Sequence, residues 1–191
     1  MKSSRMEAFS DGVIAIIITI MVLEMKVPHG DDLQALSTVL PVFISYILSF
    51  LYLGIYWNNH HHLLHTVSIV RGPILWANLH LLFWLSLIPF VTGWMGENHF
   101  ARTPVTLYGI NLFMAGTAYI ILQKQILKFH GMESSLAQAI GNDLKGKISP
   151  ILYLIAIALS QFMPIVAGLI YLLVAILWII PDRRIEKLYQ E

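Results

Sequence analysis

Three side chains that can carry charge or donate hydrogen bonds open the first apolar segment of the chain: Arg5, Ser10 and Asp11. In residues 12–23, which follow them, Thr19 is the only polar side chain. A charged side chain within a membrane segment is costly, so it usually has a partner or a function there. These residues are therefore candidates either for ion chemistry or for packing this helix against its neighbours.

Histidines form the second group of candidates. His60, His61, His62 and His65 end the second apolar segment, and His80 lies within the third. Consecutive side chains on a helix point about 100° apart, so three adjacent histidines cannot bind one ion. His65 could share an ion with His61 or with His62. No carboxylate or cysteine in that segment completes such a site, so we expect no metal and no other cofactor, and hydrogen bonding between helices is favoured.

His80 is the most deeply placed of these histidines and needs a hydrogen-bond partner. The polar side chains available to it are Ser10, Asp11 and Asn78.

The composition indicates an integral membrane protein with a single domain, residues 1–191. Of the 191 residues, 57% are hydrophobic and 12% are charged, against about 25% charged in soluble domains. The mean hydropathy is +0.70. The chain has no cysteine, which excludes disulfides and thiol catalysis. No basic cluster is dense enough to suggest a nucleic-acid partner.

The apolar runs predict an all-α fold of six transmembrane helices, because about 20 apolar residues cross a bilayer. A 30-residue helix over 151–180 would be about 45 Å long, well beyond a ~30 Å hydrocarbon core. Pro164 and Gly168 interrupt this run, which favours two short helices over one tilted, kinked helix. We also expect a short surface helix within 128–147. The expected spans are about 6–25, 38–57, 74–95, 105–127, 149–162 and 164–180.

The distribution of basic residues supports six spans. With six, ten of the twelve Lys and Arg residues fall on one side of the membrane; with five, the division is seven against five. The positive-inside rule then places both termini in the cytoplasm. Glu7 and Asp11 lie where a signal peptide would have its basic flank, so we interpret the first segment as a retained span.

The faces of the first helix carry different residues. Ile16, Ile20 and Leu23 form an aliphatic stripe with Thr19 beside it. Asp11 lies about 140° of helical rotation from Ile16. If the stripe lines a pore, Asp11 therefore faces neighbouring helices.

The sequence contains no motif of an enzyme, such as a nucleophile elbow or a Gly-rich phosphate loop. It also lacks the Thr-Val-Gly-Tyr-Gly filter, so potassium selectivity here cannot come from the usual carbonyl rings. We expect a protein that is not an enzyme.

The motif Arg5-x-x-x-Phe9-Ser10-Asp11 at the start of the first of six helices resembles the transmembrane protein 175 family of potassium channels. It is most similar to the prokaryotic members, which have one six-helix repeat. Further along, the chain has Trp57 followed by His60-His61, Asn78 in the third segment, and Pro89-Phe90 near its end. The resemblance extends over the whole chain.

This resemblance implies a homotetramer in the cytoplasmic membrane, with the first helix of each subunit lining a central pore. Ile16, Ile20 and Leu23 would form a hydrophobic constriction, and Thr19 would contribute to ion selection. The implied roles of Arg5, Ser10 and Asp11 are structural, through hydrogen bonds to the second and third helices. The full network that we expect to hold the pore helix comprises Arg5, Phe9, Ser10, Asp11, Trp57, His60, His61, Asn78 and His80.

The leading function is therefore a potassium-permeable cation channel in a lipid bilayer. One alternative is a proton-coupled or metal-ion transporter that uses Asp11 with His80, or His61 with His65. Another is an accessory membrane protein without transport activity.

Overall fold

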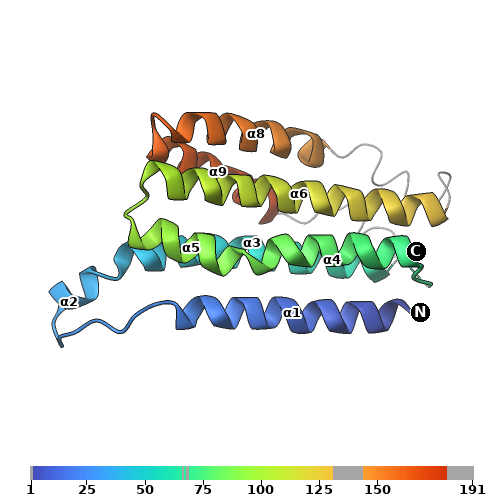
Figure 1. Cartoon of the computed structure of the whole chain (residues 1–191), viewed down its shortest axis with the longest axis horizontal. Coiled ribbons are helices and arrows are strands. Elements are labelled where there is room, and N and C mark those ends of the chain that lie inside the picture. The colour runs from blue at the N-terminus through green and yellow to red at the C-terminus, as the bar shows by residue number, and fades with distance from the viewer. Residues whose placement is uncertain (1, 66, 68, 131–143, 180–191) are drawn as a thin grey trace.

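The computed structural model describes residues 2–65, 67, 69–130 and 144–179. Over these residues the regular structure is helical, apart from one isolated antiparallel bridge between Lys2 and Ile69. The helices lie side by side in an elongated bundle (Figure 1). In chain order they are α1 (Ser3–Leu23), α2 (Leu33–Ser37), α3 (Leu40–His65), α4 (Gly72–Ser86), α5 (Ile88–Glu97), α6 (Arg102–His130), α8 (Leu144–Ser160) and α9 (Pro164–Ile179).

Four stretches in the described part of the chain are long and apolar enough to cross a membrane: Ser3–Leu23, Leu40–His65, Gly72–Glu97 and Arg102–Phe129. The helices α8 and α9 are shorter, with 17 and 16 residues. At 1.5 Å per residue these two are about 25 Å long, somewhat less than the ~30 Å hydrocarbon core. The chain is thus a multi-pass membrane protein, and the count of six spans stays a prediction.

Two helix boundaries differ from expectation. Helix α3 continues to His65 instead of ending near residue 57, and no glycine or proline lies between Trp57 and His65 to interrupt it. The histidines therefore project from its last turns. The third apolar segment is divided into α4 and α5 at Leu87, just before Pro89, which has no N–H to continue the helical hydrogen bonds.

The long apolar run near the C-terminus is interrupted between Ser160, where α8 ends, and Pro164, where α9 begins. Proline is favoured in the first turn of a helix because its missing N–H would have no partner there. Most of the surface helix expected within 128–147 lies outside the described residues, which omit 131–143.

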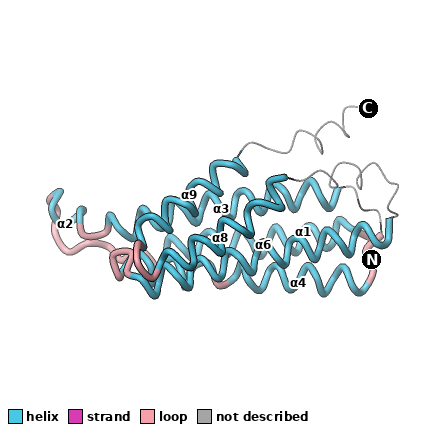
Figure 2. Tube along the Cα trace, turned by 90° about the horizontal axis from the view of Figure 1, so that it is seen from above, coloured by secondary structure: helices cyan, strands magenta, loops and turns pink. Residues whose placement is uncertain are grey.

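Helix α1 lies along one side of the bundle, where it packs against α3, α4 and α5 (Figure 1). Helices α8 and α9 pack together on the opposite side, and α6 joins them to α4 and α5. Figure 2 shows the same bundle from above. Side chains with hydroxyl groups lie in the interior, where Ser49 bonds to both Thr92 and Tyr108. Such contacts join helices that have little apolar driving force to associate in lipid.

Helix α1 is linked to its neighbours at both ends. Near its start, Glu7 contacts His61 at the end of α3, so these two helices are antiparallel. After its end, Lys26 Nζ lies 2.9 Å from Glu97 Oε1 at the end of α5. The hydrogen bond to Glu97 raises the pKa of Lys26, so this lysine stays charged. Because the pair is exposed, it contributes little to stability.

Candidate functional site

The rotation of α1 within the bundle is visible in its burial pattern. Its buried side chains recur every three or four residues, so they form one stripe on the inner face. They are Met6, Ser10, Ile14, Ile17 and Met21. The opposite face is left uncovered by the described residues of the chain.

The only polar side chain of this buried stripe, Ser10, joins three helices. Its hydroxyl donates to the carbonyl oxygen of Met6 at 2.8 Å and accepts from Asn78 Nδ2 at 2.9 Å. Asn78, on α4, is 2.7 Å through Oδ1 from His60 Nε2 on α3. All three side chains are buried. Because an amide oxygen only accepts, Nε2 of His60 carries the proton, and no described residue bonds to its Nδ1.

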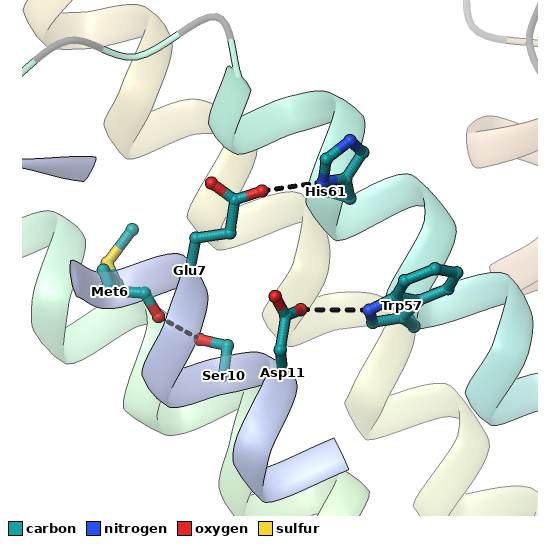
Figure 3. Close-up of polar contacts among 6 residues, drawn as sticks. All are labelled: Met6, Glu7, Ser10, Asp11, Trp57 and His61. Carbon is teal, nitrogen blue, oxygen red and sulfur yellow. Dashed lines mark hydrogen bonds and ion pairs between the residues drawn. The ribbon is translucent and has the colours of Figure 1, made fainter. Parts of the chain in front are cut away.

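Two carboxylates one helical turn apart connect α1 to α3 (Figure 3). Trp57 Nε1 donates to Asp11 Oδ1 at 3.0 Å, and His61 Nδ1 lies 2.7 Å from Glu7 Oε1. Trp57 and His61 are themselves one turn apart on α3, so the two contacts lie side by side. Together with the Ser10 contacts they fix both the position and the rotation of the start of α1.

Most of the expected network is thus brought together, with three differences. Arg5 is exposed and bonds to none of the described residues through its side chain, and Phe9 is 55% exposed. The three candidate partners for His80 were wrong: its Nε2 accepts from Trp84 Nε1 at 3.0 Å, one turn along the same helix. Asn78 is engaged by His60 instead.

Glu7 is a contact residue that the sequence analysis missed. Its spacing of four residues from Asp11 was the available signal, since residues so spaced share a helix face.

The rings of His61 and His65 stack with centroids 5.9 Å apart. In the part of the chain that the structure describes, no three or more potential metal ligands are grouped together.

The aliphatic stripe lies on the uncovered face of α1. Ile16 is 59% exposed, Ile20 40% and Leu23 81%. Thr19, also exposed, donates its hydroxyl proton to the carbonyl oxygen of Ile16 at 2.9 Å, which leaves the oxygen lone pairs free to accept. A groove of about 600 Å³ runs between α1 and α5, and Ile16 and Ile20 form part of its wall.

These features define a class of protein: a helical multi-pass membrane protein whose first helix is attached through polar contacts on one face and presents aliphatic side chains on the other. Residues 5–89 match the family described as endosomal/lysosomal potassium channel TMEM175. A potassium channel of Chryseobacterium sp. is 56% identical over 191 residues, with 100% of both chains covered. The chain therefore belongs to the TMEM175 family, whose members are ion channels and not enzymes.

Two further relatives show how far the similarity extends. The crystal structure of a lysosomal potassium-selective channel TMEM175 homolog from Chamaesiphon minutus superposes with a TM-score of 0.78 at 26% identity, covering 94% of this chain and 97% of that one. The endosomal/lysosomal proton channel TMEM175 of Homo sapiens is 36% identical over 117 residues, which are 54% of this chain and 23% of that protein.

We predict that Asn78→Leu destabilises the fold. The substitution leaves His60 Nε2 without its partner, and an unsatisfied buried donor costs about 1–3 kcal/mol. The apparent unfolding temperature of the purified protein should fall by about 2–12 °C, at roughly 2–4 °C per kcal/mol for this size. The control is Asn98→Leu, because Asn98 is exposed and bonds only within its own helix end. Equal unfolding temperatures for the two variants would contradict a stabilising role of this contact.

Proposed function

We propose that this chain forms a potassium-permeable cation channel of the cytoplasmic membrane, with six transmembrane helices and both termini in the cytoplasm. The observation that carries the proposal is the 56% identity over the full length to a protein named a potassium channel. The likeness to the potassium-selective Chamaesiphon homolog over 94% of this chain supports it.

The proposed assembly is a homotetramer in which four copies of α1 surround the pore. One helix cannot enclose an aqueous path, so several copies are required. The uncovered face of α1 supports this arrangement, because no residue among those described covers its aliphatic stripe. The groove between α1 and α5 would then receive side chains from the adjacent copy.

Ile16, Ile20 and Leu23 are the proposed constriction. Rings of aliphatic side chains can close a pore by dewetting, without any charged group in the path. The polar contacts of Ser10 and Asp11 lie on other faces of α1, which leaves them a structural role. Opening would then require the C-terminal part of α1 to splay or turn relative to its N-terminal part, which these polar contacts hold in place.

The experiment that tests the function is potassium flux from liposomes containing only the purified protein. We expect flux that depends on the protein and exceeds sodium flux. A parallel proton measurement is needed because the vertebrate relatives are named proton channels. Absence of potassium flux would contradict the proposal, and saturable, pH-coupled transport would favour the transporter alternative. The transporter alternative pairs Asp11 with His80. In this structure the two do not bond to each other: Asp11 accepts from Trp57 and His80 accepts from Trp84.

The constriction predicts that Ile20→Ala and Leu23→Ala each raise potassium flux several-fold, because a smaller side chain lowers the barrier to wetting. Ile165→Ala is the matched control, since Ile165 is also exposed and belongs to α9, which packs with α8 on the side of the bundle opposite α1. Unchanged flux in both α1 variants would argue against a hydrophobic gate.

Thr19 is proposed to contribute to ion selection, since a ring of hydroxyl oxygens can replace part of the hydration shell of potassium. Thr19→Val keeps the shape of the side chain and removes its oxygen. We expect the ratio of potassium to sodium permeability to fall, measured from reversal potentials in planar bilayers. Thr19→Ser keeps the oxygen and should retain most of the preference. An unchanged ratio in Thr19→Val would remove this role.

The absence of cysteine in the chain permits a direct test of the pore lining. In Leu23→Cys, a small cationic methanethiosulfonate reagent should reduce potassium flux, and an oxidant should cross-link subunits, because Leu23 would lie near a shared axis. Ile165→Cys should show neither effect. If both variants behave alike, α1 does not line the path.

A further inference from the structure

A cavity lies between α3, α6, α8 and α9, on the side of the bundle away from α1. Because no residue of α1 lines it, it is separate from the proposed pore. The space open to the centre of a water-sized molecule is about 50 Å³, several times the ~10–15 Å³ that one water needs. The cavity is not fully enclosed, so a larger molecule can extend out of it.

Among the described residues that line this cavity, six are aromatic and none is Asp, Glu, Lys, Arg or His. Buried rings prefer offset-stacked or edge-to-face contact with another ring. A charged ligand would find no opposite charge here, and desolvating it without one is costly. The aromatic side chains that line the cavity are Tyr52, Tyr56, Phe113, Tyr119, Tyr153 and Trp178.

Two polar side chains in the lining have unused hydrogen-bonding capacity. Tyr56 is 9% exposed and Gln123 is 8% exposed, and neither the Tyr56 hydroxyl nor the Gln123 amide bonds to any residue in the described part of the chain. Their neighbours differ: Tyr52 donates to the Tyr171 carbonyl oxygen at 2.6 Å and Trp178 to Ser149 at 2.8 Å. Neither group is among the fully buried side-chain atoms without a partner, so both keep some surface that a bound molecule can reach. Because polar groups in a protein interior are usually hydrogen-bonded, these two indicate where a molecule in the cavity would interact.

We propose that this cavity is a binding site for a small, uncharged aromatic amphiphile, a single ring that bears one hydroxyl group. The ring would pack among the tyrosines, and the hydroxyl would bond to the Tyr56 hydroxyl and the Gln123 amide. A purely apolar ring would leave both groups unpaired, which costs affinity. The site does not depend on the proposed channel function, since binding is measurable without ion flux.

The test uses ¹⁹F NMR of 4-fluorophenol added to the purified protein in lipid nanodiscs, with protein-free nanodiscs as the baseline for partitioning. We expect a saturable bound signal with the protein. Fluorobenzene, which has the same ring without the hydroxyl, should bind roughly three- to tenfold more weakly.

Variants locate the site. At Gly116 an added Cβ would lie 3.6 Å from the Tyr56 hydroxyl and 3.8 Å from a ring carbon of Tyr153. Gly116→Val therefore fits at its first carbon while its methyl groups fill the cavity, and it should abolish the bound signal. Gly168→Val is the matched control, because no atom lies within 4 Å of its added Cβ.

Tyr56→Phe and Gln123→Leu keep the bulk of the walls and remove one polar group each. Each should weaken 4-fluorophenol binding roughly three- to tenfold. Neither should weaken fluorobenzene binding, because each removes a polar group that fluorobenzene leaves unpaired. These variants keep the test valid if Gly116→Val fails to fold. The proposal is overturned if protein-free nanodiscs reproduce the signal, if fluorobenzene binds as tightly as 4-fluorophenol, or if Tyr56→Phe and Gln123→Leu bind as the unmodified protein does.

Discussion

The contact between Ser10 and Asn78 is the constraint on which the arrangement of α1 depends. Almost every side chain of α1 is apolar, so lipid and protein would accept many rotations of this helix with similar energies. The buried Ser10 hydroxyl and Asn78 amide restrict the rotation, because each must keep its hydrogen-bond partner in a medium without water. This buried contact, together with the two carboxylate contacts to α3, therefore determines which aliphatic side chains face inward and which remain uncovered.

The sequence predicted this division in part. The 140° offset between Asp11 and Ile16 follows from helix geometry alone, and the structure places the two on different faces of α1. The partners across helices were harder to predict, because spacing along one helix says nothing about the register of another. The three candidate partners for His80 therefore did not include the one it has, Trp84, one turn away on its own helix. Helix α3 extends beyond the expected span of 38–57, because the backbone of a helix can continue through polar side chains such as histidine.

The contacts of α1 are unevenly distributed along its length. Near its start, Glu7, Ser10 and Asp11 bond to α3 and α4. Beyond Asp11, its inner face meets the bundle through Ile14, Ile17 and Met21, whose dispersion contacts have little directional preference. The far end is linked by an exposed ion pair between Lys26 and Glu97. Displacing the polar start of this helix would break hydrogen bonds, whereas tilting or turning its other end requires less free energy.

This asymmetry agrees with the proposed position of the constriction. Leu23, the most exposed of the three proposed gate residues, lies at the weakly held end, where a small change in tilt moves a side chain furthest from a central axis. Ile16 lies nearer the hydrogen-bonded start and would move least. A gate in which Leu23 and Ile20 separate before Ile16 would need no change in the polar network, so the energy of opening would come mainly from wetting the aliphatic surface and from repacking apolar contacts.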